Sequence, residues 1–219
     1  MHHIIKIDTQ NIDEEGIKRA ARIVQRGGVI VFPTDTFYAL GVNPYDPQAV
    51  AKVFQLKRRE LTLPILLLIS EIEDLKQIPI EPPPNFFPLA HRFWPGPLTM
   101  VVKVADRFPA NLKGGGQTLG FRLPGADIPR DIVRQCGFPI TGSSANISGQ
   151  NPSCRVEEVI EQFGDKIDLT IDGGETRGIK GSTILDLSGS EPIILRDGDI
   201  PWQEIQDFLK FPLRFEEQK

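Results

Sequence analysis

The short apolar run at 29–32 is followed by the stretch PTDTFY, which contains several hydroxyl groups and one carboxylate. Thr34, Asp35 and Thr36 come where a buried strand is expected to end, and open α/β sheets bind ligands at the carboxyl ends of their strands. Side chains of this kind could hold a polar ligand there. The alternative is structural, because Thr34 and Asp35 could cap a turn while Tyr38 packs in the core.

Two cations lie two residues apart in the stretch LKRREL, ahead of an unbroken apolar run. Lys57 and Arg59 suit a phosphate chain, since Arg binds two oxygens at once and Lys acts as a point charge. Their alternative role is to stabilise the C-terminal end of a helix, where cations face the negative end of the macrodipole.

A third polar group lies in the loop PITGSSANISGQNPS at 139–153. Gly142 and Gly149 let the backbone approach a ligand closely. The loop also supplies neutral hydrogen-bonding groups for phosphate oxygens or a base edge, on Ser143, Ser144, Asn146 and Ser148. The loop has neither the GxxxxGK[ST] order of a P-loop nor the GxSxG order of a nucleophile elbow. It predicts a ligand-binding loop without a covalent nucleophile.

Alternating helices and strands must position these groups. Hydrophobic periodicity predicts helices at 13–28, 46–59, 71–77, 85–93, 127–136, 155–163 and 201–209. Apolar and β-branched runs predict strands at 29–32, 64–69, 98–104, 118–123, 168–172, 182–187 and 192–196. We therefore expect one α/β domain over residues 13–200, with helices outside a large, twisted sheet of parallel and antiparallel strands. Residues 201–219 are expected to add a C-terminal helix and tail, with no additional domain.

Two loop segments are open to two interpretations each. The proline-rich segment 79–97 could be a linker between domains, but its four large aromatic side chains favour a loop packed against the core. The segment 112–120 contains three successive glycines and is either a mobile lid or a flexible turn.

Composition narrows the functional classes. The 219 residues are 40% hydrophobic, which is enough for a sizeable core, and the net charge of −4 argues against a protein that coats nucleic acid, although a local basic groove stays open. No apolar run approaches the roughly 20 residues that span a bilayer, and the first residues lack a signal-peptide layout, so we expect a cytoplasmic protein without membrane contact.

Cys136 and Cys154 are too few for a disulfide framework. No third ligand is spaced to join His2 and His3, so no metal site is predicted.

Six ordered motifs resemble the YrdC family, whose members include threonylcarbamoyl-adenylate synthases. The motifs are PTDTFYALG, KRR before an apolar strand, WPGPLTMVV, TLGFRLP, SSANISG, and GSTILDL followed by ILRDG. The resemblance covers about residues 15–200 and implies a YrdC-like fold with a concave, partly basic cavity. It also implies a nucleotidyltransferase that makes threonylcarbamoyl-AMP and pyrophosphate from L-threonine, bicarbonate and ATP. That product leads to the N6-threonylcarbamoyladenosine beside the anticodon of tRNAs that read ANN codons.

The resemblance also assigns site residues. The catalytic and nucleotide-binding residues it implies are Lys57, Arg59, Ser144 and Asn146, with Thr118 and Arg196 as further ATP contacts. The threonine pocket it implies contains Thr34, Arg122 and Ser182. Mg²⁺ is expected to enter with the ATP phosphates and not on a protein site. The candidate partners are tRNA or double-stranded RNA and the machinery that transfers the threonylcarbamoyl group to tRNA.

The sequence departs from the family pattern at Leu63 and Leu68, where synthases commonly carry Asn and His, and at Ala39, where many members carry Gly. The two leucines remove polar groups from the threonine end of the implied pocket. A YciO-like branch shares the fold, so one alternative is a YciO-like nucleotide-binding relative with another substrate. A second alternative is an RNA-binding module that uses the same basic cavity.

Overall fold

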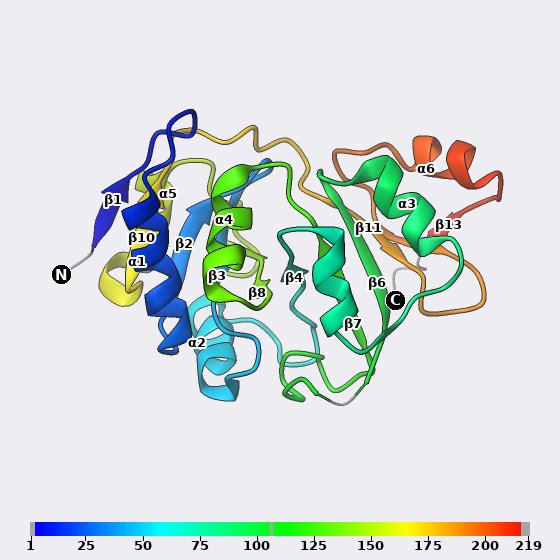
Figure 1. The fold of residues 1–219 in the computed structure, drawn as a ribbon, viewed down its shortest axis with the longest axis horizontal. Coiled ribbons are helices and arrows are strands. Elements are labelled where there is room, and N and C mark those ends of the chain that lie inside the picture. The colour runs from blue at the N-terminus through cyan, green and yellow to red at the C-terminus, as the bar shows by residue number, and fades with distance from the viewer. Residues whose placement is uncertain (1–2, 106, 216–219) are drawn as a thin grey trace.

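Two β-sheets joined at Gly142 organise the computed structural model, which describes residues 3–105 and 107–215 (Figure 1). The helices are α1 (Glu14–Gln25), α2 (Pro47–Lys57), α3 (Phe86–Phe93), α4 (Asp127–Cys136), α5 (Val156–Phe163) and α6 (Trp202–Leu209), with the 3-10 helices η1 (Ile72–Gln77) and η2 (Gly164–Lys166). The strands are β1 (Ile4–Lys6), β2 (Ile30–Pro33), β3 (Tyr38–Gly41), β4 (Leu67–Leu68), β5 (Ile80–Glu81), β6 (Leu98–Val104), β7 (Thr118–Arg122), β8 (Ile140–Thr141), β9 (Ser143–Ser144), β10 (Leu169–Asp172), β11 (Thr183–Asp186), β12 (Ile193–Arg196) and β13 (Arg214–Phe215). His2 and residues 216–219 of the predicted tail lie outside the described residues.

The first sheet has five strands in the order β1-β10-β2-β3-β9. β10 runs parallel to β1 and β2, whereas β3 is antiparallel to β2, and β9 is antiparallel to β3. β2 is buried along its whole length, as expected for a continuous apolar run with parallel pairing. The turn at 34–37 connects β2 to β3, so the PTDT residues lie at the end of this sheet.

The second sheet has the strand order β13-β12-β11-β6-β7-β4-β8, with β5 paired to β6. β11 is parallel to β6, and β6 is antiparallel to β7. The predicted α/β fold class with parallel and antiparallel strands is confirmed. The single large sheet that we predicted is instead two sheets.

The two sheets are divided because the chain passes from β8 in one sheet to β9 in the other within three residues. Gly142 lies at the crossing, and its backbone N–H donates to the carbonyl oxygen of Leu66 at 3.0 Å. A Cβ at this position would lie 2.6 Å from Leu68 Cγ, which is closer than carbon atoms pack, so the crossing needs glycine. Thr141 and Val42 add two hydrogen bonds across the seam, of 3.1 and 3.0 Å.

One core cluster lies between the five-stranded sheet and the helices α1 and α4. The Asp13 side chain accepts from the backbone N–H of Glu15 and Gly16, which fixes the start of α1. From there Ile17 and Val24 point inward at helical spacing and pack with the apolar face of α4.

A second, larger core cluster runs from the opposite face of the five-stranded sheet through the eight-stranded sheet. Phe86, Phe93 and Trp94 are buried in it, whereas Phe87 on the same segment is 41% exposed. The segment 79–97 therefore packs against the core and is not an exposed linker. In Figure 1 it carries α3 over the eight-stranded sheet.

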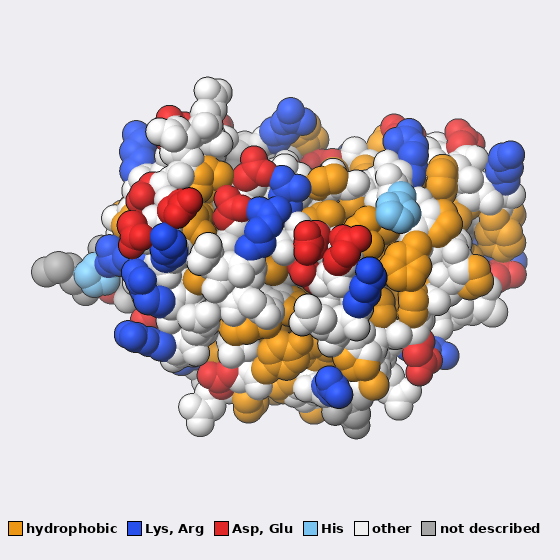
Figure 2. Space-filling view, viewed as in Figure 1, with side chains coloured by type: hydrophobic (Ala, Val, Ile, Leu, Met, Phe, Trp, Pro, Cys, Tyr) orange, Lys and Arg blue, Asp and Glu red, His pale blue; other side chains and the backbone are white. Residues whose placement is uncertain are grey.

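On the face of the molecule shown in Figure 2, the Lys and Arg side chains of the described residues do not form a continuous stripe. Over α1 and α4, Lys and Arg side chains alternate with Asp and Glu. Several of them form ion pairs within one helix, such as Lys18 with Glu14 and with Glu15 at 3.1 Å. Within the described part of the chain, no helix has the length and apolar character needed to cross a bilayer.

Candidate active site

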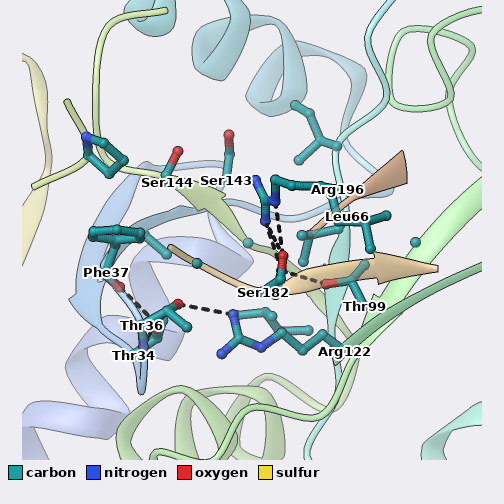
Figure 3. Close-up of a pocket in the computed structure, with 18 of the residues that line it drawn as sticks. Thr34, Thr36, Phe37, Leu66, Thr99, Arg122, Ser143, Ser144, Ser182 and Arg196 are labelled. Atoms are coloured by element: carbon teal, nitrogen blue, oxygen red, sulfur yellow. Dashed lines mark hydrogen bonds between the residues drawn. The ribbon is translucent and has the colours of Figure 1, made fainter. Parts of the chain in front are cut away.

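A cavity opens at the seam between the two sheets, and both sheets contribute to its walls (Figure 3). Its polar lining consists of six Ser or Thr side chains and four cationic side chains, while leucine, valine and isoleucine form an apolar wall. The Ser and Thr residues are Thr34, Thr36, Thr99, Ser143, Ser144 and Ser182, and the cations are Arg59, Arg122, Lys180 and Arg196. No Asp or Glu is among the described residues that line it.

The turn after β2 is closed by its own hydroxyl groups. Thr34 Oγ1 donates to the carbonyl oxygen of Phe37 at 2.7 Å and accepts from the backbone N–H of Thr36 at 3.0 Å. The two hydroxyls of Thr34 and Thr36 also lie 3.0 Å apart. Thr34 therefore caps the turn, as the structural interpretation of the motif predicts, and it lines the cavity as well.

Arg122, the last residue of β7, faces this turn from the other sheet. Its guanidinium donates to Gly96 O at 3.1 Å, to Thr36 Oγ1 at 3.1 Å and to Asp35 Oδ1 at 2.6 Å. These three bonds come from three different nitrogens, so two of the five N–H donors of the group remain for a ligand. The guanidinium is buried and fixed, and it reaches the cavity without rearrangement.

Arg196, Ser182 and Thr99 form a second polar group opposite the turn (Figure 3). Arg196 Nε and Nη2 donate to Ser182 O at 2.9 and 2.8 Å, and Nη2 also reaches Ser182 Oγ at 3.0 Å. Ser182 Oγ lies 2.9 Å from Thr99 Oγ1. Arg196 Nη1 donates to no described residue, so it is available to a ligand in the cavity.

The cavity is electrostatically positive. Burial is the main cause that lowers the pKa of Arg196, and the charges of Arg122 and Arg59 lower it further against the opposing effect of Asp199. Burial also lowers the pKa of Arg59. Arg196 is thus close enough to two other guanidiniums to feel their charge, and of the three only Arg122 is paired with a carboxylate among the described residues, that of Asp35, so the opening favours an anionic ligand.

Lys57 does not line the cavity, although we predicted that it binds phosphate. Its side chain is only 2% exposed, and Nζ donates to Ser144 O, to Asn146 O at 2.8 Å and to Asn146 Oδ1 at 3.1 Å. An ammonium has three N–H donors, so all of them are used. In this arrangement Lys57 holds the loop of Ser144 and Asn146 from behind, while Arg59 alone of the predicted pair faces the cavity.

Asn146 is likewise a structural partner in this arrangement. Its Oδ1 accepts from Lys57 and from Ser144 Oγ, and its Nδ2 donates to Ile147 O and Gln150 O at 3.0 and 2.8 Å. Asn146 does not line the cavity, whereas Ser144 does. Ser144 must release Asn146 before its hydroxyl can donate to a ligand.

Thr118 does not line the cavity, so its role as an ATP contact stays a prediction. It is the first residue of β7 and pairs with Lys103. Arg122 is four positions further along the chain, and at about 3.3 Å per residue this places the two residues about 13 Å apart along the strand. Thr118 and Arg122 belong to one sequence motif, but opposite ends of the same strand present them.

The two leucines that depart from the family pattern lie in different places. Leu63 is 45% exposed and does not line the cavity, but its carbonyl oxygen accepts from Arg59 Nε at 3.4 Å. Leu68 is buried and forms part of the apolar wall with Leu66. The cavity thus has a hydrocarbon surface where the family pattern would place histidine.

Sequence reasoning did not assign a role to Thr99 or Lys180, both of which line the cavity, and it named Thr36 and Ser143 only as members of their polar clusters. Alternation along β6 could have identified Thr99, since it is a buried polar side chain in a strand of apolar ones. Ser143 Oγ bonds to no described residue, and neighbouring Ser144 was the position that matched the family motif. The position of Lys180 depends on the long segment 173–181, which joins the two sheets (Figure 1) and had no predicted structure.

The described residues contain no cluster of three or more His, Cys, Asp or Glu side chains suited to a metal ion. The expectation that Mg²⁺ enters on ATP phosphates stays a prediction. Both cysteines are free thiols, and Cys136 is buried in the core.

Three comparisons relate the chain to known proteins. The family model Sua5_yciO_yrdC, described as "Telomere recombination", matches residues 22–198. A curated threonylcarbamoyl-AMP synthase from Pyrococcus abyssi (strain GE5 / Orsay) is 38% identical over 197 residues, which make up 90% of this chain and 58% of that relative. The chain therefore spans less than two thirds of the length of this relative.

Solved structures agree with this similarity. The crystal structure of P. abyssi Sua5 complexed with L-threonine superposes with a TM-score of 0.93 at 37% identity, covering 97% of this chain and 62% of that one. The crystal structure of E. coli YciO superposes with a TM-score of 0.83 at 27% identity, covering 91% of this chain and 97% of that one. The chain is thus similar both to a threonine-binding relative and to YciO.

Proposed function

Because the chain belongs to the Sua5/YciO/YrdC family, we propose that it is an L-threonylcarbamoyladenylate synthase acting in tRNA modification. The reaction converts L-threonine, bicarbonate and ATP into threonylcarbamoyl-AMP, pyrophosphate and water. The observation that carries the proposal is the lining of the cavity, which combines four cations and six Ser or Thr side chains without a carboxylate among its described residues. A triphosphate and an amino-acid carboxylate are both anions that such a lining favours.

The threonine substrate is proposed to bind between the turn after β2 and Ser182. Arg122 would take its carboxylate with the two N–H donors that Gly96, Thr36 and Asp35 leave. The hydroxyls of Thr36 and Ser182 lie on opposite sides of this place and could bond to the substrate hydroxyl. The crystal structure of a relative with L-threonine supports a threonine site in this fold.

The ATP phosphates are proposed to lie near Arg59, Arg196 and Ser143. Backbone carbonyls already fix both guanidiniums, since Arg59 Nη2 donates to Pro64 O at 3.1 Å and Arg196 donates to Ser182 O. Neither Nη1 group has a described partner, so binding phosphate costs little side-chain ordering. Mg²⁺ would arrive as part of the substrate and would neutralise part of the phosphate charge.

The chemistry needs positioning and charge stabilisation but no covalent protein nucleophile. The unprotonated amine of threonine first captures CO2 with loss of a proton, or bicarbonate with loss of water, to form a carbamate. A carbamate oxygen then attacks the α-phosphorus of ATP, and the bond to the β-phosphate breaks with release of pyrophosphate. Arg59 and Arg196 would stabilise the negative charge that develops on the departing pyrophosphate.

Pyrophosphate release from ATP, with each substrate omitted in turn, tests the proposal. We expect release only when L-threonine, bicarbonate and ATP are all present. Serine, which lacks one methyl group, should be discriminated against modestly, and valine, which lacks the hydroxyl, more strongly. Release that does not depend on threonine, or equal rates with threonine and valine, would overturn the assignment.

A YciO-like enzyme with another acceptor is the second candidate, and Leu68 is the observation that favours it. Its side chain gives the wall a hydrocarbon surface at the place where the family pattern has histidine. Nucleotide binding in calorimetry without threonine binding in any nucleotide state would favour this candidate. Salt-sensitive RNA binding without ATP turnover would instead favour an RNA-binding module.

A further inference from the structure

Phe37 lines the cationic cavity (Figure 3) and also faces a second hollow outside it. Phe37 and Pro152 line both hollows. The outer hollow, called here the outer groove, is otherwise lined by Ile147, Gly149, Gln150, Asn151, Cys154, Glu158, Glu161, Gln162, Gly178 and Ile179. The shared lining places the outer groove next to the cavity, with Phe37 facing both.

The two hollows differ in charge. The cavity has four cationic side chains and no acidic one among its described lining residues. The outer groove has Glu158 and Glu161, with side-chain amides beside them, and no Lys or Arg among its described lining residues. A nucleotide that occupies both must therefore place its phosphates in the cavity and its uncharged base toward the outer groove, because the carboxylates repel phosphate.

The phenyl ring is held in place by the segment 173–181. A Cβ at Gly178 would lie 3.2 Å from Phe37 Cε1, and one at Gly181 would lie 3.3 Å from Phe37 Cε2, so both glycines pack closely against the ring tip. Both have positive φ angles, +52° and +84°, which glycine adopts without strain. The Gly178 N–H also donates to Thr36 O at 2.8 Å, which ties this segment to the residue before Phe37.

We propose that Phe37 is the stacking surface for the base of the nucleotide, with the phosphates directed to Arg59 and Arg196. The ring is half-buried, fixed by its surroundings and placed at the transition from cationic to acidic lining. Base stacking on an aromatic ring is favourable for every base because each has a π face. This inference rests on the proposed nucleotide-dependent function, but it adds a specific binding role for a residue outside the predicted site.

Calorimetric titrations of ATP and of inorganic tripolyphosphate separate base binding from phosphate binding. The variants are Phe37→Leu, which keeps an apolar side chain without an aromatic ring, and Phe37→Trp, which keeps one. Phe87→Leu is the matched control, because Phe87 is partly exposed on α3 and does not line the cavity. Phe37→Leu should raise the Kd for ATP about 5- to 100-fold, the usual range for loss of one stacked base. The Kd for tripolyphosphate should stay within about twofold, since that probe has no base.

Phe37→Trp and Phe87→Leu should both keep the affinity of the parent protein for ATP. If Phe37→Leu fails to fold, an upfield ring-current shift of the adenine H2 and H8 resonances on the parent protein decides the question in its place. An unchanged ATP affinity in Phe37→Leu, an equal loss for ATP and tripolyphosphate, or an absent ring-current shift would overturn the stacking role. A parent protein that binds tripolyphosphate and ATP equally well would overturn it too, whereas one that binds neither would overturn the proposed function itself.

Discussion

Lys57 holds the 144–146 loop from inside the protein, and its environment makes its protonation sensitive to pH. Its Nζ is surrounded by oxygens of Ser144 and Asn146, which favour the charged form. Burial opposes that form most strongly, and the charge of Arg59 adds to the effect, so the pKa of Lys57 is lowered to about 7. The conformation of the loop therefore depends on a lysine that titrates near neutral pH.

The lowered pKa of Lys57 predicts a stability that increases above pH 7. An unfolded chain gives lysine its ordinary pKa of about 10.4, so between these values the unfolded state binds more protons than the folded state. The free energy of unfolding should then rise between pH 7 and pH 9, by at most about 1.4 kcal/mol per pH unit from this group. Urea unfolding at several pH values in this range measures the slope.

Lys57→Met should lose this slope, whereas Lys103→Met, which removes an exposed lysine on β6, should keep it. The difference between parent and Lys57→Met is the informative quantity, because other groups also titrate in this range. The same slope in all three proteins would mean that Lys57 keeps an ordinary pKa in the folded state.

At the scale of single residues, the spacing of Lys57 and Arg59 in the sequence predicted that they lie close together, but it did not predict where each side chain points. Lys57 and Arg59 lie together at the end of α2 as the sequence indicates, but Arg58 between them adopts a left-handed conformation with φ of 49°. Lys57 therefore turns into the core and Arg59 toward the cavity. No sequence pattern available here marks that backbone conformation, since left-handed arginine is uncommon.

At the scale of elements, the conformation of the 144–146 loop depends on the hydrogen bonds of the Asn146 side chain. Asn146→Ala removes four hydrogen bonds and leaves Lys57 with fewer acceptors. Because unsatisfied buried donors cost about 1–3 kcal/mol each, we expect a loss of about 3 kcal/mol in the free energy of unfolding. Urea denaturation measures it, and hydrogen exchange should be faster at 145–150. A loss below about 0.5 kcal/mol would contradict the structural role of Asn146.

The crossing at Gly142 should tolerate no side chain unless its neighbours shrink. Gly142→Ala places a methyl group 2.6 Å from Leu68 Cγ and 2.9 Å from Leu66 Cδ1, so the variant should lose about 1–3 kcal/mol through overpacking. Leu68→Ala opens space at the same point. The double variant should therefore be more stable than the sum of the two single losses predicts. Strictly additive losses would show that the methyl group and Leu68 do not compete for space.

Helices and strands with strong hydrophobic periodicity were predicted well, whereas the two-residue strands were not. The predicted bounds of β6 (98–104) and α4 (127–136) agree with the structure, because both are long and amphipathic or apolar throughout. The apolar run 64–69 predicted a longer strand than β4, which spans only Leu67–Leu68. Strand β9 was predicted as loop because its two serines carry no apolar signal, and its pairing with β3 comes from tertiary structure.

At the scale of the whole molecule, the cavity lies where two sheets meet, so a bound ligand should couple them. Thr34 and Ser144 belong to the five-stranded side, and Arg122, Ser182 and Arg196 to the eight-stranded side. Before any ligand binds, Arg122 is already bonded across the seam to Thr36 and Asp35, whereas Arg196 is fixed by Ser182 on its own side. The ligand adds further contacts that require both sides at once.

Hydrogen–deuterium exchange tests this coupling. Saturating ATP with L-threonine should slow amide exchange in 34–38 and 143–146 and, at the same time, in 181–184. The outer strands β1 and β13 should keep their exchange rates, because they lie at the far ends of the two sheets. Protection confined to one sheet would contradict a ligand that spans the seam.

Isotope incorporation tests most directly whether this cavity joins threonine, bicarbonate and ATP into one product. The protein is incubated with ATP, L-threonine and ¹³C-bicarbonate, and the nucleotide products are analysed by mass spectrometry. We predict threonylcarbamoyl-AMP that carries one ¹³C atom, with labelled product strongly reduced in Arg122→Gln and retained in Phe87→Leu. Release of pyrophosphate without a ¹³C-labelled, threonine-containing nucleotide, or no turnover by the folded protein, would contradict the account.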